Sequence, residues 1–414
     1  MIKILKYALI CAILAFNFFP VKISFIPIGM NRIVEVIGLL YLLRFYLNCK
    51  DKYLVKILRL YAYLLFLAIA VSVINAHFDF QFYFFILSPL FTIGIGIWIC
   101  NIAGKGFTLS RLCDLIIIVQ CIQAVASFAI FLNPSLGSAI QSIFTNVSDD
   151  DIQLGEYRLI GIGNTYINAA VNYGVATMLL TLLPYLDDSL LYRRKFLYIT
   201  CAILIATAGI LSARTYMFVF VPIALFLFCK TKNVLRMIGK TLRFTIIVAI
   251  AVAVLGNVFS QYLDFERYEH MISWAFEVFK TYEESGEIGS SSSTKVVAMY
   301  EILPDNVTTW VIGDGWFSMP ENKFYMDTDI GYGRHLFYWG LLGLLSYIIV
   351  VKKSYWILRS ISKDKTISLF LVFLLLFEAM LNFKGILNFG TFVGLILSFF
   401  IVQRCQCNKQ IERA

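Results

Sequence analysis

Charged residues are scarce in this chain. They make up 15% of its 414 residues, whereas hydrophobic residues make up 60% and the mean hydropathy is +0.79. Soluble domains usually contain about 25% charged and about 45–50% apolar residues. The shortage of charge excludes an ordinary soluble protein and predicts an integral membrane protein.

Several motifs of well-known enzyme classes are absent. The sequence has only three histidines, and it contains no HExxH, no paired CxxC, no Walker-type phosphate loop and no GxSxG motif. Its nine cysteines all fall in expected helices or on the expected inner side, so no disulfide framework is expected in the outer loops. No metal site and no cofactor are expected.

Long apolar runs dominate what is present. A transmembrane helix needs roughly 20 mostly apolar residues, and scanning with that length gives about twelve candidates. They lie near residues 4–20, 33–47, 54–75, 80–103, 112–133, 164–186, 196–213, 215–229, 244–260, 335–351, 367–383 and 386–402. The sequence predicts an all-α, polytopic membrane protein in which residues 1–414 form a single membrane domain.

The basic residues indicate an orientation. With the N-terminus placed inside, the inner connections and adjoining helix ends hold 25 of the 35 lysines and arginines. Cytoplasmic connections carry such an excess, so both termini are expected in the cytoplasm. This topology also accounts for the net charge of +9, and the scattered basic residues lack the aromatic interleaving of a nucleic-acid surface.

The expected outer connections are short except for two, 134–163 and 261–333. The longer one holds thirteen of the 26 acidic residues. Apolar residues recur at helical spacing over 265–282, which predicts an amphipathic helix that lies on the bilayer or packs on the transmembrane helices. A short helix is expected over 294–303, and "WVIGDGWF" at 310–317 predicts a brief strand followed by a glycine turn. The region is thus a large, partly helical extracytoplasmic loop.

Three arginines stand at outer ends of the expected helices: Arg158, Arg214 and Arg334. A charged side chain inside a membrane is costly in free energy unless it pairs with an opposite charge, reaches the membrane surface or faces water. A charge that is kept at such a position is therefore a candidate for function. The rigid guanidinium matches phosphate oxygens bidentately, so three such groups on one face can hold a diphosphate. The alternative is that each arginine only extends its charge to the membrane surface.

The stretch "DTDIGYGRHLFYWGLLG" at 327–343 adds further candidates. Gly331 and Gly333 are expected to allow the positive φ that aims backbone amides at an anion. Asp327 and Asp329 are candidates for a general base or for a partner of the neighbouring arginine. His335 can take a proton or cap the helix.

These residues carry a resemblance. "SART" at a short outer turn, "GDG", and then "DIGYGRHLFYWGLLG" resemble the O-antigen polymerase family, in which the last large periplasmic loop runs into a glycine-rich helix. Arg158 and Gly174 have fifteen residues between them, similar to the Arg-x15-Gly pattern of that family. The related O-antigen ligases share the architecture and carry an outer-loop histidine, so His335 keeps that alternative open.

The resemblance implies an activity. A glycosyltransferase of this kind moves a growing glycan from a polyprenyl-diphosphate carrier onto a lipid-linked repeat unit at the periplasmic face of the bacterial inner membrane. We expect Arg334, His335 and Asp329 to be catalytic. The expected substrate-binding residues are Arg158, Arg214, Gly174, Gly331, Gly333 and Asp327. Partners would be the lipid-linked oligosaccharide, membrane lipid and a chain-length regulator protein, but no nucleic acid.

Two competing interpretations remain. A twelve-helix flippase for lipid-linked oligosaccharides has the same topology, but flippases tend to have short loops and charges deep within helices. Here only Glu35 and Glu378 are expected within the membrane, and the long outer loop argues against a transporter. A purely structural scaffold is disfavoured by the outer arginines.

Overall fold

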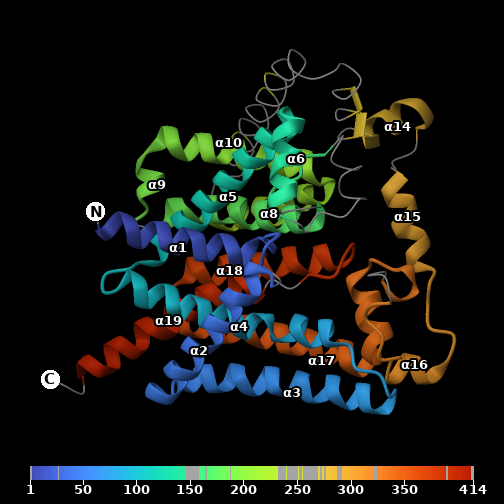
Figure 1. Ribbon diagram of the computed structural model, residues 1–414, viewed down its shortest axis with the longest axis horizontal. Helices are drawn as coiled ribbons and strands as arrows, with labels where there is room; N and C mark the ends of the chain where they lie inside the picture. The colour runs from blue at the N-terminus through green and yellow to red at the C-terminus, as the bar shows by residue number, and fades with distance from the viewer. Residues whose placement is uncertain are drawn as a thin grey trace. The chain divides into compact units, whose positions relative to one another are not determined.

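The computed structural model describes residues 2–26, 28–144, 158–163, 166–186, 188–231, 239, 250, 254, 269–270, 273–274, 277–286, 291–319, 324–387 and 390–411. In Figure 1 this part of the chain is drawn almost entirely as helices. The sheet contacts within it are two isolated β-bridges, so the all-α expectation is confirmed for the described residues. The chain divides into two compact units, Met1–Val34 with Ile102–Gly289 and Glu35–Asn101 with Ser290–Ala414.

The first unit is organised around three helices that pack on one another, α5, α8 and α10. Asn133 ends α5, and its side-chain oxygen accepts a hydrogen bond from the Leu136 amide 3.2 Å away to begin the next helix. The described elements are α1 (Ile2–Phe18), α5 (Leu109–Leu132), α6 (Pro134–Ile143), α8 (Tyr166–Leu182), η1 (Leu183–Tyr185), α9 (Leu190–Arg193), α10 (Lys195–Ser212), η2 (Arg214–Val219), α11 (Phe220–Lys230) and α14 (Glu277–Ser285).

The second unit packs α3, α18 and α19 against α17. Carboxylates begin two of these helices: Asp51 accepts from the Tyr53 amide at 2.8 Å, and Asp364 accepts from the Ile367 amide at 2.9 Å. The described elements are most of α2 (Met30–Asn48), α3 (Lys52–Ile74), most of α4 (Phe80–Ala103), α15 (Ser291–Tyr300), α16 (Val307–Val311), η4 (Tyr325–Asp327), α17 (Gly331–Ser362), α18 (Lys365–Asn382) and α19 (Gly390–Ile411).

Seven helices of the described chain are long and apolar enough to cross a membrane. They are Lys52–Ile74, Phe80–Ala103, Leu109–Leu132, Ile167–Tyr185, Lys195–Ser212, Gly331–Ser362 and Lys365–Asn382. The chain is therefore a polytopic membrane protein, whereas the count of about twelve spans stays a prediction. The expected span 215–229 begins as the 3-10 turn η2 and continues in α11 for only 11 residues, and 244–260 lies outside the described residues except for 250 and 254.

Both long connections contain helices among their described residues. Segment 134–163 holds α6, and segment 261–333 holds α14, α15, α16 and η4. The helix expected over 294–303 is confirmed as α15, displaced by three residues. Most of the amphipathic pattern over 265–276 lies outside the described residues, while α14 covers its C-terminal end. The extracytoplasmic position of both segments and the single-domain organisation stay predictions.

The brief strand expected at residue 310 is wrong. Asn306 accepts hydrogen bonds from the Thr309 amide at 2.8 Å and begins α16, which extends to Val311. Side-chain capping therefore overrides the β-branched composition of this stretch. The glycine turn that follows is confirmed, because Gly313 and Gly315 both have positive φ, +83° and +72°.

Helix α17 is interrupted close to its start. Trp339 (φ −134°, ψ 19°) and Gly340 (φ 65°, ψ −169°) leave the helical conformation, which frees carbonyl groups of the preceding turn. The Asp314 amide donates to the Phe337 carbonyl at 2.7 Å, and the Gly315 amide donates to the Tyr338 carbonyl at 2.9 Å. Irregular backbone inside a membrane protein requires such internal partners. The turn after α16 thus completes the broken helix.

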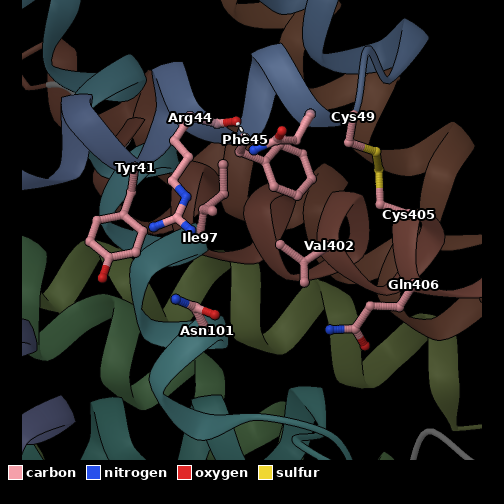
Figure 2. Close-up of a pocket in the computed structure, with 10 residues that line it drawn as sticks. Tyr41, Arg44, Phe45, Cys49, Ile97, Asn101, Val402, Cys405 and Gln406 are labelled. Atoms are coloured by element: carbon pink, nitrogen blue, oxygen red, sulfur yellow. Dashed lines mark hydrogen bonds between the residues drawn. A yellow bond between two sulfur atoms is a disulfide. The ribbon is translucent and has the colours of Figure 1, made fainter. Parts of the chain in front are cut away.

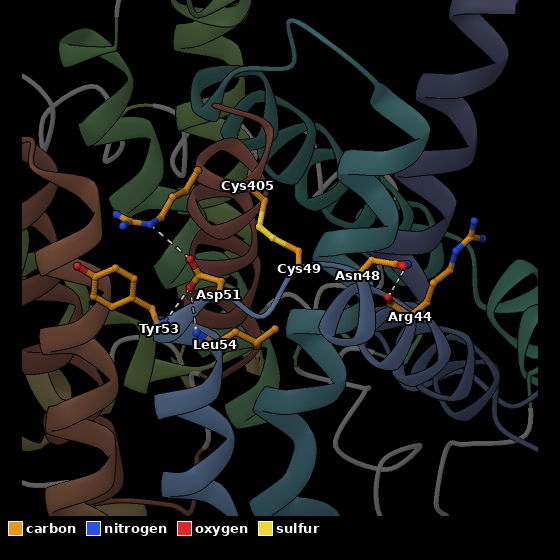
Figure 3. Close-up of a disulfide and its surroundings, with 8 residues drawn as sticks. Arg44, Asn48, Cys49, Asp51, Tyr53, Leu54 and Cys405 are labelled. Carbon is orange, nitrogen blue, oxygen red and sulfur yellow. Dashed lines mark hydrogen bonds and ion pairs between the residues drawn. A yellow bond between two sulfur atoms is a disulfide. The ribbon is translucent and has the colours of Figure 1, made fainter. Parts of the chain in front are cut away.

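A disulfide joins Cys49, after α2, to Cys405 in α19, with Cα atoms 6.6 Å apart (Figure 3). Beside it, Asp51 forms an ion pair with Arg404 at 3.4 Å. Both cysteines belong to the lysine- and arginine-rich side that the sequence assigns to the cytoplasm, where disulfides are rare. The charge pattern and the disulfide therefore make opposing predictions about the compartment at this end.

Counting thiols tests the disulfide. We expect alkylation of the denatured, unreduced protein to modify the seven cysteines that are free in the structure, and alkylation after reduction to modify all nine. Cys405→Ser should free Cys49 and raise the unreduced count by one, whereas Cys407→Ser should lower it by one. Intact-mass spectrometry gives these counts, and nine modified thiols in unreduced wild-type protein would contradict the pairing.

Candidate functional site

Arg334 lies in the first turn of α17 and is 6% exposed. Its Nη2 donates to the Phe317 carbonyl at 3.0 Å. The guanidinium carbon lies 3.9 Å from the centre of the Phe317 ring and 4.1 Å from the centre of the Phe324 ring. Its Nε is buried and has no hydrogen-bond partner among the described residues. The cation is therefore held rigidly while one of its donors is left for another acceptor.

Asp79, at the start of α4, fixes the segment that holds Arg334. Its buried carboxylate accepts from the Phe317 amide at 3.2 Å and from the amide and hydroxyl of Ser318, both at 2.9 Å. These bonds position the Phe317 carbonyl and ring around Arg334. Sequence reasoning missed Asp79, although a single acid in the apolar stretch "HFDFQF" at the mouth of a helix was the available signal.

The two candidate acids near the start of α17 are both exposed. Partial burial of its carboxyl group raises the pKa of Asp329, and the positive charges of Arg334 and Lys384 oppose that rise. Asp327 ends η4 with a φ of +48°. Of the two, Asp329 is the one whose carboxyl group interacts electrostatically with Arg334.

His335 is fully buried. Its ring stacks on Tyr347 with centroids 4.2 Å apart and on Trp339 with centroids 5.6 Å apart. Neither ring nitrogen has a hydrogen-bond partner among the described residues. A general base must come within hydrogen-bond reach of the proton that it removes, and in this conformation an aromatic cage separates His335 from solvent. Its catalytic role stays a prediction.

The positive φ expected at Gly331 and Gly333 is wrong. Both glycines have helical backbone, and neither is among the positive-φ residues. A Cβ atom on Gly331 would lie 2.7 Å from the Gly385 carbonyl oxygen, so this glycine permits close packing against the chain after α18. A Cβ atom on Gly333 would meet only ordinary contacts at 3.6 Å and beyond. Helix packing therefore explains Gly331 without an anion.

The other two arginines come together in the first unit. The Arg158 guanidinium lies 4.4 Å from the centre of the Trp274 ring, and that of Arg214 lies 5.1 Å from it. Arg214 Nη1 also pairs with the carboxylate of Glu277 in α14. The backbone beside Arg158 is anchored where the Leu159 amide donates to the Leu211 carbonyl at 3.1 Å. The structure thus brings Arg158 and Arg214 to one tryptophan, a partner that sequence spacing did not indicate.

Gly174 lies inside α8 and is buried. The fifteen-residue spacing from Arg158 therefore ends within a packed helix of the first unit. The role of Gly174 in binding glycan stays a prediction.

Aromatic rings gather beside the turn that follows α16. His77 stacks on Trp316 with centroids 3.5 Å apart, and Trp316 stacks on Tyr325 with centroids 6.4 Å apart. The Tyr325 hydroxyl donates to Asp314 at 3.1 Å, and the Thr309 hydroxyl donates to the same side chain at 2.5 Å. His77, Trp316, Tyr325 and Asp314, which we call the aromatic face, combine flat rings with a carboxylate, the surface chemistry that pyranose sugars contact.

Comparison of the chain with protein-family models, curated proteins and solved structures found no match. The described residues contain no group of three or more histidine, cysteine, aspartate or glutamate side chains arranged to hold a metal ion. The features of the described residues that bear on function are the pair Arg158 and Arg214, Arg334 with Asp329 beside it, and the aromatic face.

Proposed function

We propose that this protein is an O-antigen polymerase. It transfers a growing glycan from a polyprenyl-diphosphate carrier onto a lipid-linked repeat unit, at the periplasmic face of the bacterial inner membrane. Seven apolar helices support its place in a membrane. The resemblance of "DIGYGRHLFYWGLLG" and "SART" to that family motivates the choice of reaction.

Arg334 is the observation that supports the proposal best. A buried guanidinium normally has all its donors satisfied, because an unpaired buried charge is costly. Here the cation is fixed by the Phe317 carbonyl and two phenyl rings, yet Nε lacks a partner among the described residues. A diphosphate oxygen would complete this coordination. A cation that only extended to the membrane surface would be exposed, but Arg334 is 6% exposed.

The residues of the second unit suffice for a balanced reaction. The acceptor sugar hydroxyl attacks the anomeric carbon of the donor glycan, and the bond from that carbon to the diphosphate oxygen breaks. The bonding electrons leave with the diphosphate, whose developing charge Arg334 stabilises. The hydroxyl proton passes to Asp329, whose raised pKa makes it a stronger base than an ordinary aspartate. The aromatic face orients the sugar.

Arg158 and Arg214 serve the same chemistry in the first unit. Stacked against Trp274 and partly neutralised by Glu277, they form a rigid cationic surface for glycan or diphosphate oxygens. In this proposal both termini lie in the cytoplasm, as the distribution of lysine and arginine favours. Membrane lipid, the lipid-linked oligosaccharide and a chain-length regulator protein are the expected partners.

Deleting the protein in its host tests the proposal. We expect lipopolysaccharide with a single repeat unit on its core, because the unit is made and attached but not extended. A ligase would instead leave the core without any repeat and preserve lipid-linked polymer. A flippase would leave single repeat units on the cytoplasmic side of the membrane. Either of these two outcomes would contradict a polymerase, and plasmid-borne wild-type protein should restore the full ladder.

A further inference from the structure

A cavity with a cationic lining lies in the second unit, away from the residues of the aromatic face. It has a volume of about 240 Å³ and is lined by the ends of α2, α4 and α19 (Figure 2). Arg44 comes from α2, Asn101 from α4 and Gln406 from α19. Figure 2 shows the Arg44 guanidinium extending from α2 toward the side of the cavity where Asn101 lies.

The walls of this cavity are held in place by close helix packing. A Cβ atom on Gly94 in α4 would lie 2.1 Å from the Gly38 carbonyl oxygen in α2, so these helices touch through their backbones. A Cβ atom on Gly96 would lie 1.8 Å from the Ser398 hydroxyl in α19. Small residues at such positions are typical of helix contacts in membranes. The three helices therefore form a preformed site.

Two covalent or ionic links hold the part of the cavity wall that Cys49 and Cys405 form. Cys49 and Cys405, which both line it, are joined by the disulfide, and Arg404 pairs with Asp51 next to them (Figure 3). Because the chain between the two cysteines spans most of the sequence, this link holds α19 to the connection between α2 and α3. Binding here requires little reordering of the wall.

The polar lining matches a phosphate group. The Arg44 side chain makes no hydrogen bond or ion pair with any described residue, so its fork of donors is available. Its backbone carbonyl accepts from the Asn48 amide at 2.8 Å, which keeps Asn48 at the rim. The amide groups of Asn101 and Gln406 add donors from the other two helices. One cation with several neutral donors is suited to a singly charged phosphodiester.

The remaining lining is apolar. Phe45, Ile97 and Val402 form this part of the wall, which gives no favourable contact to a bare phosphate ion but can cover the glycerol and first methylene groups of a lipid. Lysines 50 and 52 follow α2 at the same end, and basic pockets between transmembrane helices attract anionic head groups. We propose that this cavity binds the head group of an anionic phospholipid, with Arg44 on its phosphate.

Binding of defined lipids to purified protein tests this assignment. Protein in neutral detergent is titrated with phosphatidylglycerol, phosphatidylcholine or inorganic phosphate, and native mass spectrometry measures the bound fraction. We expect wild-type protein to bind phosphatidylglycerol most tightly. Arg44→Ala should weaken that binding by about 10- to 100-fold, the range for loss of a charged hydrogen-bonding group. Arg59→Ala is the matched control, because Arg59 is an exposed cation of the adjacent helix α3 that does not line the cavity.

The proposal would be overturned by unchanged lipid affinity in Arg44→Ala, by equal losses in Arg44→Ala and Arg59→Ala, or by equal affinity for phosphatidylcholine. Competition by inorganic phosphate at the same concentration would reject a lipid in favour of a free anion. Asn101→Leu provides a second variant, for which we expect a smaller loss. Unfolding temperatures measured without lipid identify any variant that fails to fold. The measurement involves no glycan transfer, so its outcome is independent of the proposed activity.

Discussion

Arg334→Ala should lower the rate of glycan polymerisation by about 10²–10³-fold, the loss typical of removing one charge contact to a transition state. The guanidinium is positioned by the Phe317 carbonyl at 3.0 Å and by two phenyl rings, so water or another side chain cannot occupy its place equivalently. The rate is measured with purified variants and lipid-linked repeat units. A residual rate above about a tenth of wild type would contradict the diphosphate role, because it is far above the range that such a loss allows.

Two further variants separate chemistry from folding. Arg334→Gln keeps an amide that can donate to the Phe317 carbonyl, so it preserves part of the packing and removes the charge. It should be as inactive as the alanine variant while unfolding close to the wild-type temperature. Arg359→Ala is the matched control, because Arg359 lies near the other end of the same helix, is exposed and bonds to the Ser368 hydroxyl at 2.5 Å. It should retain wild-type activity.

Gly340→Ala should prevent stable folding of the second unit. The φ of 65° and ψ of −169° at Gly340 lie in a region that is essentially restricted to glycine, at a cost of about 1–3 kcal/mol for other residues. A Cβ atom there would also lie 2.3 Å from the backbone carbon and oxygen of Val311. Because backbone cannot move aside as a side chain can, α16 would separate from the break in α17. The expected total is several kcal/mol, at the severe end for single substitutions.

Thermal unfolding in detergent, with the monodisperse fraction after size-exclusion chromatography, measures this effect. Gly333→Ala is the control for stability, because it lies on the same helix and a Cβ atom there meets nothing closer than 3.6 Å. It should leave the unfolding temperature unchanged or slightly raised, since alanine favours a helix more than glycine does. Equal stability of the alanine variants at 333 and 340 would mean that the interruption of α17 does not form as described.

The length of the apolar runs made much of the helical framework predictable. The runs 54–75, 80–103 and 112–133 correspond within a few residues to α3, α4 and α5. Asp51 and Asp364 begin helices as their residue type favours. The break at Gly340 was not predictable in the same way, because its cause is distant in sequence: the turn at Asp314 must supply donors for the Phe337 and Tyr338 carbonyls. A hydropathy profile averages over many residues, so it does not reveal that these two carbonyls accept hydrogen bonds from a distant turn instead of from their own helix.

The candidate site followed a similar pattern. Arg158, Arg214 and Arg334 were chosen as candidates because a charged side chain at a membrane is costly in free energy. That cost depends on the residue type alone, so it can be read from the sequence. The neighbours that fix them, Asp79 and Trp274, were missed because they come from elements far away in sequence. The glycines of "DIGYGRH" were misinterpreted for a related reason, since a glycine that permits close helix packing and one that permits positive φ look identical in sequence.

Release of polyprenyl diphosphate during polymerisation tests the central claim most directly. Purified protein is incubated with lipid-linked repeat units alone, without nucleotide sugar, and polymer length and free carrier diphosphate are measured together. The account predicts one carrier diphosphate released for each linkage formed, with both products lost in parallel in Arg334→Ala and retained in Arg359→Ala. Polymer that forms without release of carrier diphosphate, or release that continues unchanged in Arg334→Ala, would contradict it.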